Sequence, residues 1–94
     1  MKKHGSDRYS LRYAESVKRQ DIPDLPDSAR MLIQKAIETR LAVNPIGFGK
    51  PLRYAFKGHR RLRVSVYRVI YRIEPEDRIV RIVGIKHRKD IYDE

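Results

Sequence analysis

The residues of this chain that can do chemistry gather in its second half, where basic side chains recur between β-branched and aromatic ones. The stretch HRRLRVSVYRVIYRI, residues 59–73, places an arginine at nearly every second or third position of a pattern that predicts strands. A strand face built in this way carries a dense row of fixed positive charge, which fits a polyanion. The stretch KHRKDIY, residues 86–92, adds further cations, a histidine and a tyrosine.

Cleavage of RNA without a metal is a reaction that suits these side chains. The 2′-hydroxyl of the nucleotide attacks the phosphorus, so the protein supplies a base, an acid for the leaving oxygen and cations for the charge that develops on phosphate. The arginine fork binds phosphate oxygens in pairs and stays charged. Arg61 and Arg68 are therefore the candidates for holding the phosphate.

The candidates for moving a proton are fewer. Histidine is the side chain that titrates nearest neutral pH, which favours His59 and His87. Lys86 joins them only where neighbouring cations favour its neutral form. Tyr92 is expected to stack on a base or to hydrogen-bond the phosphate. Each assignment has a plainer interpretation, namely a solvated strand arginine for Arg68 and a surface histidine for His59 or His87.

The composition is that of a small globular protein. The chain has 94 residues, 40% hydrophobic and 36% charged, so we expect residues 1–94 to form one domain. Cysteine is absent, which excludes disulfides and thiolate metal sites. Three scattered histidines show no metal-ligand spacing, so neither a metal nor a cofactor is expected. No apolar run approaches the length that spans a bilayer, and the cytoplasm is the expected location.

Positive charge is spread over both halves of the chain. The net charge is +10 and the isoelectric point lies near 10.2. Such a protein is drawn to nucleic acid or to an acidic protein, with strong dependence on salt. A basic surface that serves solubility alone is the alternative that charge by itself leaves open.

The apolar pattern predicts a strand followed by helices. Residues 8–14 alternate with the period of a half-buried strand, and residues 14–22 favour a short helical turn. Apolar residues at helical spacing predict a helix over 29–43, capped by Asp27 or Ser28.

The second half predicts a loop and then an antiparallel meander. Asn44-Pro45 should end the helix, because the residue before a proline is pushed out of the helical region. Residues 44–53 contain two prolines and two glycines and are predicted to form a loop. Turns are expected at Ser65 and at Pro75-Glu76-Asp77. The predicted strands cover roughly 54–64, 66–74 and 78–86. Helices beside such a sheet define the α+β class, and we expect about four antiparallel strands flanked by two or three helices.

Several motifs are specific in combination. They are NP at the end of the long helix (44–45), GKPLR (49–53), RLRVSVYRVIYRI (61–73) and GIKHRKDIY (84–92). Together they resemble the RelE/ParE superfamily of bacterial toxins, and more closely its RelE-like ribonuclease branch, over nearly the whole chain. The family's fold, a RelE-like microbial-ribonuclease-type sheet flanked by helices, agrees with the predicted elements.

The resemblance implies a toxin of a type II toxin-antitoxin system, an endoribonuclease that cleaves messenger RNA on the ribosome and so inhibits translation. The family's central phosphate-binding arginine follows a tyrosine and falls on Arg68. Many relatives have Gly-Asp where this chain has Ser65-Val66, and the exact basic residues differ. On chemistry and resemblance together, the catalytic candidates are His59, Arg61, Arg68, Lys86, His87 and Tyr92. The further RNA-binding candidates are Arg63, Arg81, Arg88 and Lys89.

The resemblance also implies a cognate antitoxin that holds the toxin inactive in a hetero-oligomer. We expect an acidic antitoxin segment with an amphipathic apolar stripe, which inhibits either by covering Arg61 and Arg68 or by displacing residues 86–92. Two other functions stay open. One is a ParE-like toxin that poisons DNA gyrase without cutting nucleic acid, against which HRKDIY at 87–92 counts. The other is a basic adaptor that only binds RNA or a partner protein.

Overall fold

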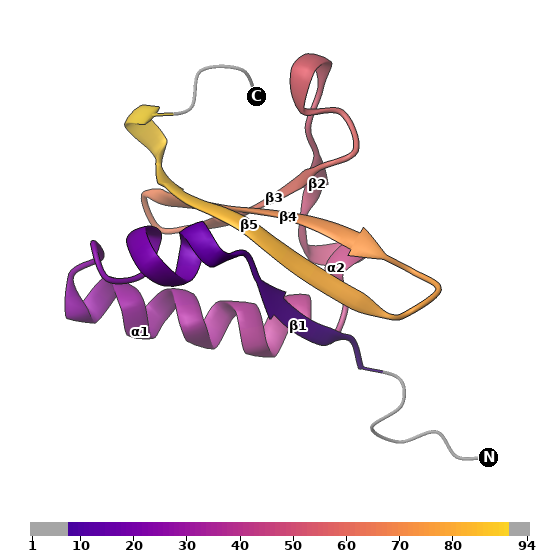
Figure 1. The fold of residues 1–94 in the computed structure, drawn as a ribbon, viewed down its shortest axis with the longest axis horizontal. Helices are drawn as coiled ribbons and strands as arrows, with labels where there is room; N and C mark the ends of the chain where they lie inside the picture. The colour runs from indigo at the N-terminus through magenta and orange to yellow at the C-terminus, as the bar shows by residue number, and fades with distance from the viewer. Residues whose placement is uncertain (1–7, 91–94) are drawn as a thin grey trace.

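The fold is a five-stranded sheet with helices on one face (Figure 1). The computed structural model describes residues 8–90. For Ala55 it describes the backbone alone. In spatial order the strands are β1 (Ser10–Tyr13), β5 (Ile79–His87), β4 (Tyr67–Glu74), β3 (Arg60–Val64) and β2 (Lys50–Pro51). The predicted α+β class is confirmed.

The last three strands form the predicted antiparallel meander. Their turns fall where the sequence predicts them, with left-handed backbone at Ser65 (φ 58°) and at Arg78 (φ 52°), which follows Pro75-Glu76-Asp77. β1 differs from the prediction, because it pairs with β5 in parallel. The sheet is therefore mixed rather than purely antiparallel, and the chain between β1 and β5 provides the crossover that parallel pairing needs.

Two helical segments cover one face of the sheet. A π-helical segment, Val17–Asp21, follows β1, and α1, Asp27–Ala36, continues in π-helical geometry over Ile37–Leu41. The predicted cap is wrong, because Pro26 occupies the N-cap position and no side chain caps the helix. Asp27 lies instead in the first turn, where negative charge is favoured by the helix dipole. No helix within residues 8–90 is long and apolar enough to cross a membrane.

The hydrophobic core lies between these helices and the sheet. Ile33, Ile37 and Leu41 supply the helical side and are almost completely buried. The sheet supplies Leu62, Val64, Val69, Tyr71, Val80, Ile82 and Ile85. Within residues 8–90 no helix covers the opposite face of the sheet, which is formed by the residues that alternate with these core positions (Figure 1).

The strand predicted from residue 54 begins only at Arg60. Tyr54–Phe56 forms a 3₁₀ turn instead, and two residues of this connection, Tyr54 (φ 57°) and Gly58 (φ 94°), have left-handed backbone. A strand requires extended dihedrals with negative φ, so the chain cannot pair here. The apolar and aromatic residues of the sequence RYAF (53–56), which favoured a strand, belong to an exposed turn.

The loop predicted over 44–53 contains short ordered elements. The Asn44 side chain accepts a hydrogen bond of 3.0 Å from the Gly47 N–H and caps α2, Pro45–Phe48. Proline suits the first position of this helix, because its fixed φ is helical and its missing N–H is not needed there. The Asn-Pro pair therefore starts a new helical turn as well as following the end of the long helix.

Tyr71 fixes this segment to the sheet from inside the core. Its hydroxyl donates a hydrogen bond of 2.6 Å to the Pro45 carbonyl, and burial raises its pKa, so it stays a protonated donor. A Cβ on Gly49 would collide with the same hydroxyl, which explains the glycine of GKPLR. Arg60 completes the attachment by donating to the carbonyls of Ile46 (2.9 Å) and Gly49 (3.0 Å).

We predict that Tyr71→Phe lowers the free energy of unfolding by about 1–3 kcal/mol, because the Pro45 carbonyl loses its hydrogen bond inside the protein. Urea unfolding followed by circular dichroism measures the change. Tyr54→Phe is the matched control, since the Tyr54 side chain is exposed and its hydroxyl should contribute little. Equal stability of the two variants would contradict the role of the Tyr71 hydroxyl.

Candidate nucleic-acid interface

Three cations lie in register across neighbouring strands. Arg63 of β3 lies opposite Arg68 of β4, and Arg68 lies opposite Lys86 of β5. We call these three residues the cationic row. Residues directly opposite one another in antiparallel strands have Cβ atoms about 4.5–5.5 Å apart, and like charges in such positions destabilise a sheet. The row therefore places three cations next to one another across three strands.

The cationic row lies on the face of the sheet that the helices leave uncovered. Arg63 stands between the buried Leu62 and Val64, and Arg68 precedes the fully buried Val69. Successive side chains of a strand point to opposite faces, so both arginines point away from the core. Arg61 shares this face, two residues before Arg63. The structure therefore brings together four predicted site residues, Arg61, Arg63, Arg68 and Lys86.

β5 contains one extra residue at the point where it approaches the row. Ile70 pairs with Gly84, but the next residue of β4, Tyr71, pairs with Ile82. Val83 is left between the two pairs, which defines a β-bulge. A bulge changes the phase of the alternation, so side chains on either side of it no longer follow one pattern.

The bulge decides which way Lys86 points. Ile82 faces the core before the bulge, and strict alternation from Ile82 would put Lys86 in the core as well. The extra residue reverses this, so that Ile85 is buried and Lys86 is exposed opposite Arg68. Lys86 lies alongside Gly84, with its Cε 3.6 Å from the position that a Cβ on Gly84 would take.

A carboxylate that the sequence analysis missed holds this part of β5. Asp21, at the end of the π-helical segment, accepts a hydrogen bond of 2.8 Å from the backbone N–H of Ile85. β1 pairs with β5 only as far as Ile82, so Asp21 supplies an acceptor beyond the reach of β1. No local pattern signals this role, because the contact joins residues 64 positions apart.

His87 lies at the end of β5 opposite Tyr67. The two rings meet edge to face, with centroids 5.4 Å apart and planes at 74°. The backbone N–H of Lys89 donates to His87 Nδ1 at 3.1 Å. In the neutral imidazole the proton is then on Nε2, so His87 presents an N–H donor at that atom.

The remaining predicted residues lie around this centre. His59 precedes β3, and its Nδ1 is buried with no hydrogen-bond partner among residues 8–90. Arg88 and Lys89 are exposed in a short 3₁₀ turn, and the Arg88 N–H donates to the Val66 carbonyl at 2.7 Å, which ties this turn to the β3–β4 hairpin. Tyr92 lies outside the described residues.

Arg81 lies at the other end of the open face and is paired with a carboxylate. Arg81 Nε donates to Glu74 Oε2 at 2.7 Å, and an Arg72 guanidinium nitrogen lies 3.6 Å from the same oxygen. The hydrogen bond from Arg81 lowers the pKa of Glu74, which keeps this carboxylate charged. Its charge offsets the cations at this end of the face, whereas the cationic row lies at the other end. The assignment of Arg81 to RNA binding stays a prediction.

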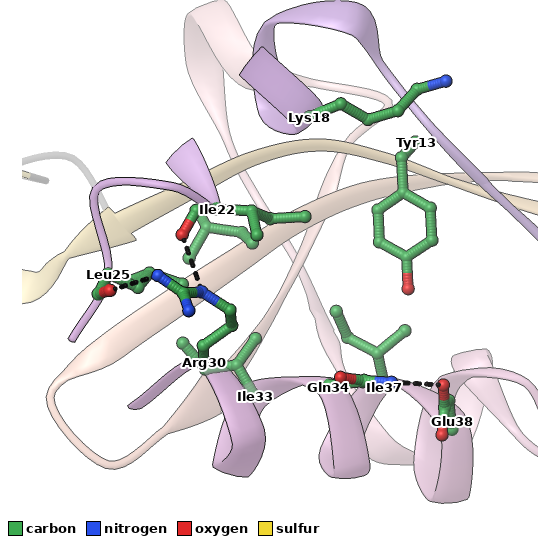
Figure 2. Close-up of a pocket in the computed structure, with 10 residues that line it drawn as sticks. Tyr13, Lys18, Ile22, Leu25, Arg30, Ile33, Gln34, Ile37 and Glu38 are labelled. Atoms are coloured by element: carbon green, nitrogen blue, oxygen red, sulfur yellow. Dashed lines mark hydrogen bonds between the residues drawn. The ribbon is translucent and has the colours of Figure 1, made fainter. Parts of the chain in front are cut away.

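A separate groove lies on the helical side of the sheet, with a volume of about 380 Å³ (Figure 2). Its apolar lining comes from Tyr13, Ile22, Leu25, Ile33, Ile37 and Ile85, and its polar lining from Lys18, Arg30, Gln34 and Glu38. Arg30 donates to the carbonyls of Ile22 (3.2 Å) and Leu25 (2.8 Å), so its charge serves the structure of this turn. Burial, with the nearby charge of Glu38, raises the pKa of Tyr13.

The fold is that of a small α+β protein with basic residues on the open face of its sheet, and comparison with known proteins specifies its family. The family model "ParE toxin of type II toxin-antitoxin system, parDE" matches residues 10–92. Toxin RelG of Mycobacterium tuberculosis is 33% identical over 84 residues, which cover 89% of this chain and 95% of RelG. The chain belongs to the RelE/ParE superfamily of toxins of type II toxin-antitoxin systems.

Solved structures agree with this assignment. The toxin-antitoxin complex RelBE2 of M. tuberculosis contains a chain that is 30% identical, with a TM-score of 0.80 and coverage of 85% of this chain and 98% of that one. The archaeal RelE-RelB complex of Pyrococcus horikoshii shares the fold at 20% identity, with a TM-score of 0.68 and coverage of 89% and 99%. The isolated RelE toxin of Escherichia coli shares it at 18% identity, with a TM-score of 0.69 and coverage of 84% and 83%.

We predict that Asp21→Ala lowers the free energy of unfolding by about 1–3 kcal/mol, because the Ile85 N–H loses a charged acceptor. Urea unfolding measures the loss, and amide hydrogen exchange at Ile85 should accelerate. Asp24→Ala, which removes an exposed carboxylate three residues away, is the matched control. An Asp21→Ala variant as stable and as well protected at Ile85 as Asp24→Ala would show that the contact contributes nothing.

Proposed function

We propose that this toxin is an endoribonuclease that cleaves messenger RNA on the ribosome without a metal and thereby inhibits translation. The cationic row carries the proposal, because it places several phosphate-binding groups within reach of one phosphate. Arg61, on the same face, supports it. RNA-binding roles for Arg88 and Lys89, next to His87 in sequence, belong to the same proposal.

The proposed chemistry follows from where charge develops. The scissile phosphate lies over the row with Arg68 at its centre, and the 2′-hydroxyl of the preceding nucleotide attacks the phosphorus. Negative charge then grows on the non-bridging oxygens, and donors already in place stabilise it without reorganising. A general base takes the proton of the 2′-hydroxyl, the 5′-oxygen leaves with a proton from a general acid, and the other product ends in a 2′,3′-cyclic phosphate. Arginine and lysine neutralise the charge that a metal ion would neutralise in other nucleases.

His87 is not assigned to base catalysis in this arrangement. A general base needs a free lone pair, but Nδ1 accepts from Lys89 and Nε2 carries the proton. His87 also lies beside Tyr67, which packs against the core, so alternation puts it on the other face of β5 from Lys86 and the cationic row. Tyr92 keeps its proposed role, which is to stack on a base or to hydrogen-bond the phosphate.

Poisoning of DNA gyrase is the second candidate, because the matching family model is that of ParE toxins. The curated relative and several solved structures carry RelE-type names instead. The register of Arg63, Arg68 and Lys86 favours phosphate chemistry over a binding-only role. Gyrase supercoiling measured beside cleavage of ribosome-bound messenger separates the two candidates, and inhibited supercoiling with intact messenger would select the second.

We also propose a cognate antitoxin as partner, since related toxins occur in toxin-antitoxin complexes. An acidic amphipathic segment suits this chain, because its net charge is +10 and the groove in Figure 2 has an apolar lining with Lys18 beside it. Electrostatic attraction should set the association rate, and apolar contact should set the lifetime of the complex.

We predict that Arg68→Ala lowers the rate of messenger cleavage about 10²- to 10³-fold with the fold intact, as expected for removal of one donor to a developing oxyanion. Primer extension on ribosome-bound messenger measures the rate. Arg72→Ala is the matched control, because Arg72 lies on the same strand and the same face but beside Glu74, and it should cleave nearly as the wild type does. Equal activity of the two variants would place the site elsewhere.

We further predict that cleavage survives chelation of divalent metals, because the proposed charge stabilisation comes from the cationic row. The chelator is used at a concentration that leaves ribosomes intact, as checked by sedimentation. Loss of cleavage that added Mg²⁺ or Mn²⁺ restores, while the ribosomes stay intact, would overturn the metal-independent mechanism.

A further inference from the structure

The connection between β2 and β3 exposes aromatic rings to solvent. We call residues 53–59, Arg53 to His59, the aromatic tip. The Tyr54 side chain is 79% exposed and that of Phe56 is 45% exposed. Large apolar rings are normally buried on folding, so two of them exposed on one short turn indicate a surface that binds something.

The backbone of the aromatic tip is ordered by its own hydrogen bonds. The Leu52 N–H donates to the His59 carbonyl at 2.9 Å and closes the connection. Three further backbone hydrogen bonds of 3.0–3.1 Å lie within it. The N–H groups of Phe56, Lys57 and His59 donate to the carbonyls of Arg53, Tyr54 and Phe56, respectively. The rings therefore stand on a turn that is already organised, and a ligand would not have to order it.

Tyr54 also adopts a backbone conformation that its side chain disfavours. Its φ is 57°, in the left-handed region where a residue with a Cβ is strained. Burial of the ring does not compensate for this strain, because the ring is exposed. Residues with a strained backbone that no packing or burial in the folded protein offsets are found at binding sites more often than elsewhere.

The position of the aromatic tip relates it to the cationic row. β2 pairs with β3 at Lys50 opposite Arg61, so the tip extends from the edge strand next to the one that carries Arg61 and Arg63. Figure 1 shows this connection on the side of the sheet away from α1, which is the side of the cationic row. Arg53 and Lys57 add positive charge on either side of the exposed rings.

We propose that the aromatic tip is a stacking platform for unpaired RNA bases, and that it binds the strand whose scissile phosphate lies on the cationic row. Single-stranded nucleic acid offers flat bases alternating with phosphates, and exposed rings between cations match that alternation. A protein partner would favour a continuous apolar patch, whereas here cations flank the rings. This inference rests on the proposed function and adds to it a second contact that positions the substrate.

A tryptophan probe tests stacking directly, because the chain contains no tryptophan of its own. Tyr54→Trp is titrated with a single-stranded RNA that carries 2′-O-methyl groups and so cannot be cleaved through its 2′-hydroxyls. Stacking should quench the tryptophan fluorescence. Met31→Trp is the matched control, since Met31 is 72% exposed on α1 on the helical side, and its fluorescence should not change.

Affinity measurements separate stacking from charge. Loss of one ring should weaken RNA binding about 5- to 100-fold while leaving the salt dependence unchanged. Lys57→Ala should instead lower the slope of log affinity against log salt by about 0.7, the value for one phosphate contact of a single strand. Tyr54→Asn is the preferred ring deletion, because asparagine tolerates left-handed φ and keeps the turn folded. Met31→Ala should bind RNA as the wild type does.

Each outcome decides the proposal. RNA bound equally well by wild type, Tyr54→Asn and Phe56→Ala, with cleavage still dependent on Arg68, would overturn the platform and leave the nuclease proposal standing. No RNA binding by the wild type would overturn both. Quenching of Tyr54→Trp by heparin, a polyanion without bases, to the same extent as by RNA would reduce the tip to a charge contact. Quenching by poly-glutamate but not by RNA would assign the tip to an acidic protein instead.

Discussion

One extra residue in β5 determines what the open face of this sheet can do. Without the bulge at Val83, alternation would put Lys86 in the core and leave Arg68 opposite an apolar side chain. With the bulge, β5 supplies buried residues to the core on both sides of the irregularity and still presents a cation beside Arg68. The hydrogen bond from the Ile85 N–H to Asp21 then anchors the bulged segment to the helical layer, so the core and the basic face depend on the same few residues.

The two faces of the sheet have opposite requirements. The covered face gains stability from buried aliphatic side chains, whereas the open face places basic side chains side by side. Arg30 and Arg60 show that a basic residue in this protein also serves structure, because both donate to backbone carbonyls of turns. Glu74 offsets the cations at one end of the open face, and the cationic row lies at the other. The position of each arginine, rather than the net charge, therefore distinguishes the structural arginines from those proposed to bind phosphate.

Sequence patterns predicted much of this, because the strongest of them are local. Alternation in residues 61–73 reflects a strand with one buried face, and the turns at Ser65 and Pro75 follow from short-range preferences. Contacts between distant residues were missed: the parallel pairing of β1 with β5, the Asp21 contact to Ile85 and the bulge itself. The aromatic tip was predicted to be a strand, because its apolar and aromatic residues favour strand pairing. Of its two residues with left-handed backbone, Tyr54 and Gly58, only the glycine is of a type that indicates such a conformation. Histidine roles also depended on geometry, because only the Lys89 contact defines the His87 tautomer.

If the cationic row stabilises attack by a 2′-hydroxyl on the adjacent phosphate, the chemistry of the product ends must show it. A messenger carrying a single 2′-deoxy nucleotide immediately 5′ of the cleavage point is compared with the unmodified messenger, and the fragments are analysed by mass spectrometry. We expect the unmodified messenger to give a 2′,3′-cyclic phosphate or its hydrolysed form, with a 5′-hydroxyl on the other fragment. The modified messenger should stay intact at that position, because it lacks the attacking hydroxyl. Cleavage of the deoxy substrate at the same position, or fragments that carry a 3′-hydroxyl and a 5′-phosphate, would rule out attack by the 2′-hydroxyl.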